Sequence, residues 1–114
     1  MPATIQPGAT FRENVLQMPS VDGLSRIDLL DQDGAVVASI ANEPGKQGSL
    51  AVYQYLRQHH EMLDMEAADH GLVVFAEHTQ DARSRPGAHP NIDRLLEIAA
   101  GADPLRVECI PIND

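Results

Sequence analysis

The chain has 114 residues, 43% of them hydrophobic, with two Phe, two Tyr and no Trp. Its 17 acidic side chains outnumber 8 Lys and Arg, which gives a net charge of −9. This charge repels nucleic-acid backbones and anionic membrane surfaces, so we expect neither as a partner. The length is typical of a single domain that buries its own core.

The cysteine count and the N-terminal sequence exclude further kinds of protein. Cys109 is the single cysteine, which excludes a disulfide within the chain and a Cys-rich zinc site. Residues 1–9 contain two prolines and a glycine, so we predict a flexible tail followed by a single domain over residues 10–114. The tail lacks a basic region and an apolar run, and no stretch reaches the ~20 apolar residues of a membrane span. We therefore expect a cytoplasmic protein.

Hydrophobic periodicity predicts both helices and strands. In chain order, the predicted elements are a short helix 11–17, strands 26–31 and 35–40, helices 50–60, 65–83 and 90–100, and a strand 104–110. We expect the last strand to join the hairpin in one small sheet, with the helices packed on a face of it. The predicted fold class is therefore α+β.

Turn residues indicate how the two hairpin strands pair. Asp33 and Gly34 lie between the strands and are typical of a two-residue type I′ turn. This turn would place Leu29 opposite Ala38, with their side chains toward the core.

Two further residues carry local information about the helices. Ser49 is a favoured N-cap for the helix predicted over 50–60. Gly71 lies within the helix predicted over 65–83, where it costs about 1 kcal/mol relative to Ala. We take this cost to indicate a close approach by another helix, or a bend.

Four stretches together carry a resemblance: residues 27–31, 44–50, 75–79 and 86–96. The most specific is the last, Pro-Gly-Ala-His-Pro-Asn-Ile-Asp-Arg-Leu-Leu. Over roughly residues 11–110 the chain resembles a family of small bacterial proteins known only as domain of unknown function 2322. The resemblance implies a bacterial, stand-alone domain, and it supplies neither an activity nor catalytic residues.

Histidines and carboxylates in 76–96 form the first candidate site. His78 and Asp81 are three residues apart on a predicted helix and share a face. His89 follows a Pro-Gly corner that could return it toward His78, and Asp93 lies four residues further on. Imidazoles with carboxylates suit zinc, iron or manganese. We therefore consider His78, Asp81 and His89 as catalytic residues, and His78, His89 and Asp93 as metal ligands.

Each of these residues also has a structural explanation. His89 can act as a weak cap before the helix predicted from residue 90, and Asp93 is favoured by the dipole of its first turn. Asp81 can pair with Arg85 one turn later. The spacing of the histidines matches no established metal signature.

A glycine-rich loop forms the second candidate site. Lys46, Gly48 and Ser49 lead into a helix N-terminus, where backbone N–H groups favour phosphate or carboxylate. Three arginines could add positive charge to this anion-binding site: Arg83, Arg85 and Arg94. The spacing is not that of a P-loop, so a plain loop is the alternative.

The sequence thus leaves three functions open. We favour a module that binds a small ligand or a protein partner without chemistry of its own. A metal-dependent or acid/base enzyme centred on His78 and His89 is the first alternative, and anion binding at 45–49 is the second. The edges of a small sheet could also pair with a second copy of the chain. The sequence does not decide whether the protein is an enzyme, nor identify a cofactor.

Overall fold

The computed structural model describes residue 8, residues 10–18 and residues 20–112. Except for Gly8, the tail predicted for residues 1–9 lies outside the described residues. The elements are α1 (Phe11–Val15), β1 (Leu24–Leu30), β2 (Val36–Ala41), α2 (Gln47–His59), α3 (Met65–Val74), α4 (Glu77–Ser84), α5 (Pro90–Ala99) and β3 (Arg106–Pro111). This is the predicted α+β class, with one more helix than expected.

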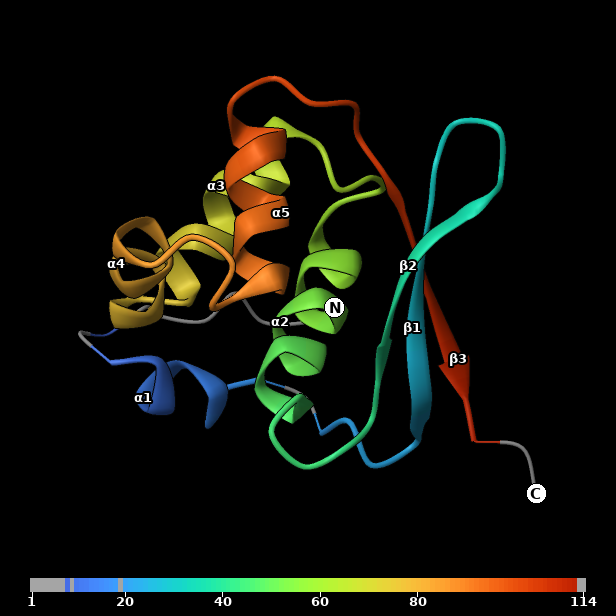
Figure 1. The fold of residues 1–114 in the computed structure, drawn as a ribbon. Helices are drawn as coiled ribbons and strands as arrows, with labels where there is room; N and C mark the ends of the chain where they lie inside the picture. The colour runs from blue at the N-terminus through green and yellow to red at the C-terminus, as the bar shows by residue number, and fades with distance from the viewer. Residues whose placement is uncertain (1–7, 9, 19, 113–114) are drawn as a thin grey trace.

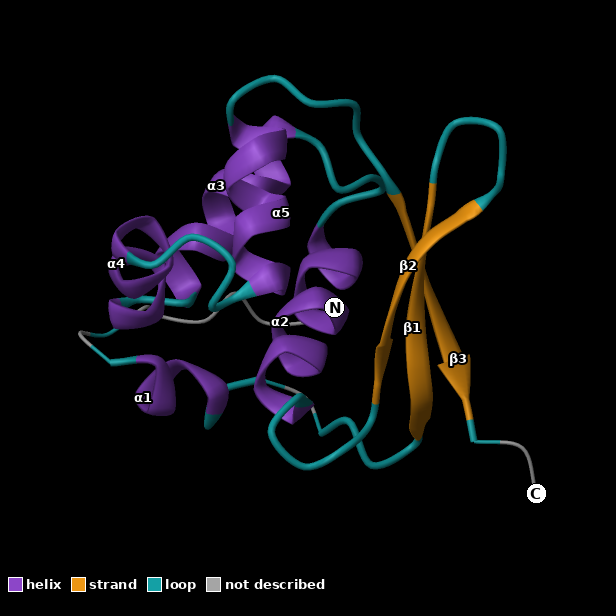
Figure 2. Cartoon of the chain, in the orientation of Figure 1, coloured by secondary structure: helices purple, strands orange, loops and turns teal. Residues whose placement is uncertain are grey.

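The three strands form an antiparallel sheet in the order β2-β1-β3, and the helices lie on one face of it (Figures 1 and 2). Ile27 and Leu29 on the central strand are fully buried. Leu29 pairs with Ala38 on β2, as predicted, and Ile27 pairs with Cys109 on β3. Cys109 is half-buried, and this burial raises the pKa of its thiol, so the thiol is protonated at neutral pH.

Helix α2 is the centre of the packing. It contacts all three strands on one side, and α1 and α3 on the other. Helix α5 packs along α3 and also contacts α4, so the helices form a second layer behind α2 (Figure 1). Aliphatic side chains of α2, such as Leu50 and Leu56, are buried between these layers.

The hairpin turn differs from the predicted two-residue turn. The N–H of Asp31 donates to the carbonyl of Ala35 at 2.9 Å, which leaves a three-residue loop. The Asp31 carboxylate accepts from the N–H groups of Asp33 and Ala35, and Gly34 adopts φ 85°. The type I′ prediction is wrong because the Asp31 side chain stabilises a longer turn that a dipeptide signal does not reveal.

The helix predicted over 50–60 begins earlier than expected, at Gln47. A turn closed by the N–H of Lys46 and the carbonyl of Glu43, with Gly45 at φ 87°, directs the chain into the helix. Lys46 is therefore the N-cap residue. Ser49, the predicted cap, lies instead within the first helical turn.

The single helix predicted over 65–83 is wrong: the segment forms two helices, α3 and α4. In a continuous helix, the carbonyls of Leu72 and Val74 would accept from backbone N–H groups four residues later. Here Thr79 Oγ1 donates to the Leu72 carbonyl at 2.6 Å, and Asn14 Nδ2 donates to the Val74 carbonyl at 2.8 Å. Two side chains thus replace backbone donors and stabilise the break.

Candidate functional site

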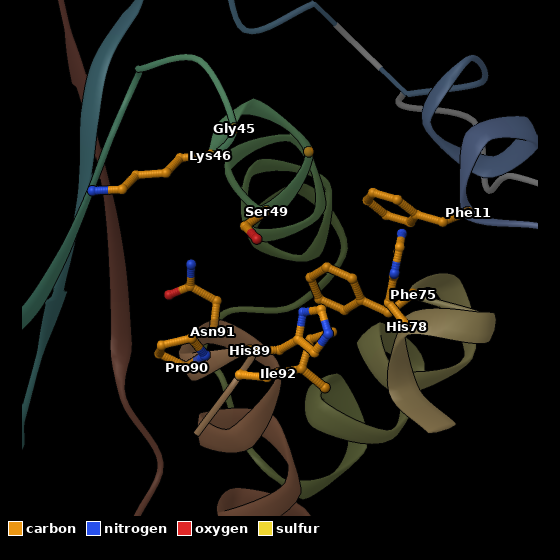
Figure 3. A pocket seen from close by; sticks show the side chains of 12 residues that line it. Phe11, Gly45, Lys46, Ser49, Phe75, His78, His89, Pro90, Asn91 and Ile92 are labelled. Atoms are coloured by element: carbon orange, nitrogen blue, oxygen red, sulfur yellow. The ribbon is translucent and has the colours of Figure 1, made fainter. Parts of the chain in front are cut away.

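A cavity of about 360 Å³ lies between the starts of α2 and α5 and the joint between α3 and α4 (Figure 3). Its polar lining comes from the start of α2 (Lys46, Gly48 and Ser49), from α4 (His78) and from the start of α5 (His89 and Asn91). The glycine-rich loop and the two histidines of the other candidate site, far apart in the chain, therefore line one cavity.

Aromatic side chains form a wall of this cavity. The ring of Phe11 stacks on Phe75 with centroids 5.2 Å apart and meets His78 edge-on at 5.1 Å. A Cβ at Gly48 would come within 2.8 Å of the Phe11 ring, so glycine permits this close packing at the start of α2. The N–H of Phe11 donates to Glu77 Oε1 at 2.7 Å, and this bond holds the pKa of Glu77 below its usual value.

His89 is held by an ionised carboxylate. Its Nε2 lies 2.6 Å from Asp81 Oδ2, and Arg85 binds both oxygens of the same carboxylate. The bonds from Arg85 and then His89 hold the pKa of Asp81 well below its usual range. The rings of His78 and His89 have centroids 5.8 Å apart. The structure therefore brings together the three residues considered as catalytic, with the His89 side chain 27% exposed.

Asp93 has a different neighbour. Its carboxylate accepts from the N–H of Gly87 at 2.9 Å and so fixes the corner before α5. Within the part of the chain that the structure describes, no group of three or more His, Cys, Asp or Glu side chains is spaced for a metal ion. Of the three residues considered as metal ligands, the structure thus places His78 and His89 together and Asp93 at the corner.

Two helix N-termini open toward the cavity. Lys46 and His89 are the N-cap residues of α2 and α5, and within the described chain neither side chain makes a capping hydrogen bond. The first-turn N–H groups of a helix lack intrahelical partners. In α5, however, the first residue is Pro90, which has no N–H, and the Ile92 N–H donates to the His89 carbonyl at 3.0 Å, so this helix contributes the N–H of Asn91. Ser49 and Asn91 add a hydroxyl and an amide to the lining. The Lys46 side chain extends away from the histidines (Figure 3), and its Nζ lies 3.5 Å from Glu43.

The three arginines proposed as anion ligands do not gather at the cavity. Arg85 binds Asp81, and Arg83 is exposed and is not among the described residues that line the cavity. Arg94 acts from behind the lining, because its Nη1 donates to Asn91 Oδ1 at 2.9 Å and to Tyr53 Oη at 3.1 Å.

Tyr53 completes this support. Its hydroxyl donates to the Asn91 carbonyl at 2.6 Å, and burial raises the pKa of Tyr53 to about 12. Sequence reasoning did not select Asn91, Phe11 or Phe75 for the site. Asn91 and Phe75 both belong to stretches that carry the family resemblance, which was the one available signal. Phe11 and Phe75 otherwise look like ordinary core residues until the fold brings their rings together.

The model of a family described as an uncharacterized protein conserved in bacteria (DUF2322) matches residues 11–109. The chain belongs to the DUF2322 family. The match spans every described helix and most of β3, so the cavity is built from residues within the family region. No curated protein and no solved structure matches the chain. No helix in the described ranges is long and apolar enough to cross a membrane.

Proposed function

We propose that this DUF2322 protein is a binding domain for a small anionic ligand, which occupies the cavity between the starts of α2 and α5. The observation that carries the proposal is that the loop 45–49 and the pair His78 and His89 line the same cavity. Its volume of about 360 Å³ suits a small organic molecule, since such sites measure roughly 300–1,000 Å³.

The chemistry of the lining favours a negative group on the ligand. The N-terminal end of α2 supplies backbone donors, α5 adds the N–H of Asn91 after Pro90, and both helices present the positive ends of their dipoles. Ser49 and Asn91 can donate hydrogen bonds, and an imidazole of His78 or His89 can donate one as well. The aromatic wall would cover the apolar part of the ligand.

Part of the site is held in place before any ligand binds. Arg94 and Tyr53 fix Asn91, while Asp81 fixes the ring of His89. Side chains that are already ordered lose less entropy on binding, which favours affinity for a small ligand.

The proposal is tested by titrating inorganic phosphate and succinate into isotope-labelled protein. We expect saturable shifts of the Gly48, Ser49 and Asn91 amide signals, together with the ring signals of His78 and His89. Ser49→Ala should weaken the response, whereas Arg83→Gln is the matched control and should leave it unchanged. Uniform small shifts over the surface, without saturation at these residues, would refute the proposal.

The contact between Asp81 and His89 favours a second candidate, an acid/base enzyme. A carboxylate that accepts from Nε2–H places the proton of neutral His89 on that nitrogen, and Nδ1 then carries the lone pair of a general base. The second imidazole, His78, lies close enough to act on the same ligand.

Nitrogen NMR of the histidine rings tests this arrangement directly. We expect neutral His89 to be the Nε2–H tautomer, and Asp81→Asn to lose this preference. Arg83→Gln should preserve it. A wild-type ring protonated on Nδ1 would contradict the assignment of His89 as the base.

A further inference from the structure

The other three histidines form a cluster at the end of α2 and on α3. None of them is among the described residues that line the cavity. His60 Nε2 lies 3.0 Å from His70 Nδ1, and the Tyr55 hydroxyl lies 3.1 Å from His70 Nε2. The ring of His59 packs 4.6 Å from the Tyr55 ring and 6.2 Å from the His70 ring.

The short contact between His60 and His70 constrains their protons. Two ring nitrogens at 3.0 Å form a hydrogen bond only if one carries a proton and the other a lone pair. A tautomer shift that moves this single proton to the other nitrogen of the same ring leaves two lone pairs that face each other. Such a pair is a ready chelate for a metal ion, because imidazole binds metals through a deprotonated ring nitrogen.

We propose that His60 Nε2 and His70 Nδ1 bind a late first-row divalent metal ion, such as Zn²⁺ or Ni²⁺, with His59 as a third ligand. In a tetrahedral site with metal–nitrogen bonds of 2.0–2.1 Å, two ligand nitrogens are about 3.3 Å apart. The observed 3.0 Å is close to this value, so the pair needs a small separation together with a tilt of both rings, which turns the two lone pairs from each other toward the ion. Imidazole ligands suit zinc, copper and nickel.

His59 supports a third ligand position. Its Nε2 is buried and has no hydrogen-bond partner among the described residues. Buried polar atoms nearly always have a hydrogen-bond partner, so a buried nitrogen without one needs an explanation, such as a bound ion. Since no described trio is already spaced for a metal ion, the site is built on the pair, and the side chain of His59 turns toward it on binding.

Tyr55 has the position of a supporting residue. When His70 Nδ1 binds the ion, Nε2 carries the proton and donates it to the Tyr55 hydroxyl. Such an outer partner fixes the tautomer and the ring orientation of a ligating histidine. The net charge of −9 also raises the concentration of cations near the protein.

The test uses tag-free protein, first treated with a chelator and then titrated with Zn²⁺ or Ni²⁺ in a calorimeter. We expect saturable binding with one ion per chain. His70→Gln and His60→Asn should each abolish it, with circular dichroism as the check of folding. Tyr55→Phe should weaken affinity by about tenfold, the lower end for loss of an outer partner.

His78→Asn is the matched control, since it removes an imidazole from the cavity and should leave metal affinity unchanged. Absence of saturable binding would overturn the proposal. So would equal affinity in wild type and in folded His60→Asn, or a loss of binding in His78→Asn instead, which would place the metal in the cavity.

Discussion

Ala76 adopts φ 52° and ψ −120° at the joint between α3 and α4, directly after Phe75 and two residues before His78. A residue other than glycine that is held in this sparsely populated backbone conformation is strained by about 1–3 kcal/mol. Such strain persists only where surrounding contacts enforce it. Here the strained joint positions Phe75, which belongs to the aromatic wall of the cavity, and His78, which supplies one of its imidazoles.

Ala76→Gly should therefore stabilise the protein. Glycine relieves the strain but loses about 0.4–1 kcal/mol through the greater freedom of the unfolded chain. We expect a net gain of about 1 kcal/mol in the free energy of unfolding, measured by urea denaturation. Ala82→Gly, within helix α4, is the matched control and should lose stability. A loss for Ala76→Gly as well would show that the joint is not strained.

Asp81 makes stability dependent on pH. Its pKa is lowered in the folded state, mainly by Arg85 and then by His89, from the ordinary value of 3.8. Its ionised form therefore stabilises the fold fully above pH 3.8, and this contribution is lost as pH falls below that value. We expect Asp81→Asn to be destabilising at pH 7, with the difference from wild type shrinking below pH 4.

Arg85→Gln provides the control for this pH effect. In that background, Asp81→Asn should show a weaker pH dependence, because the principal partner of the carboxylate is gone. An unchanged pH dependence of the difference would assign the effect to another contact.

For single residues, the sequence allowed candidates to be selected, while their contacts depended on tertiary packing. His78, Asp81 and His89 could be selected because histidines and carboxylates at helical spacing are visible in the chain, and the structure brings them together. Arg94 stood out as a charge, but its contact with Asn91 depends on tertiary packing. No local pattern could reveal that contact.

Among the elements, the packing of α3 on α5 depends on Gly71. A Cβ at this position would lie 2.8 Å from Leu95 Cδ1 and 2.9 Å from Leu56 Cδ1. Both leucines are fully buried, so neither has room to move away. The structure therefore contains the close approach of another helix, which the glycine inside a predicted helix had indicated.

Gly71→Ala sets two effects against each other. Alanine gains about 1 kcal/mol in helix propensity, whereas overpacking a core costs about 1–3 kcal/mol. We expect a net loss of about 1 kcal/mol in the free energy of unfolding. In a Leu56→Ala background only the contact with Leu95 remains, so the loss caused by Gly71→Ala should become smaller. A loss of equal size in both backgrounds would exclude steric contact with Leu56 as the cause.

The sequence predicts elements well where one pattern decides them. The alternating run that becomes β3 and the two hairpin strands follow from periodicity, and the pairing of Leu29 with Ala38 was correct although the turn was not. The break between α3 and α4 was missed because its stabilising donors, Asn14 and Thr79, act across the joint. A helical periodicity that continues past residue 75 conceals such a break.

The whole molecule is strongly acidic, while its cavity offers donors to anions. A net charge of −9 opposes compaction through mutual repulsion, which salt screens over a Debye length of about 8 Å at 0.15 M. We therefore expect the thermal midpoint to rise with NaCl up to physiological ionic strength. This effect depends on total charge, so Ser49→Ala should show the same rise as wild type.

Phosphate at matched ionic strength separates screening from binding. A ligand that binds the folded state alone stabilises it by about 2.7 kcal/mol at 100 times its Kd, so phosphate should raise the midpoint more than NaCl does. Phosphate is also excluded from protein surfaces and stabilises folded proteins generally. The decisive quantity is therefore the excess over NaCl in wild type compared with His89→Gln and Ser49→Ala. We expect this excess to shrink in both variants and to persist in Arg83→Gln. Ser49→Ala removes a hydroxyl donor from the lining, and His89→Gln replaces the imidazole held by Asp81 with a flexible amide. An excess equal in all four proteins would be general exclusion, and the cavity would then have no selective affinity for the anion.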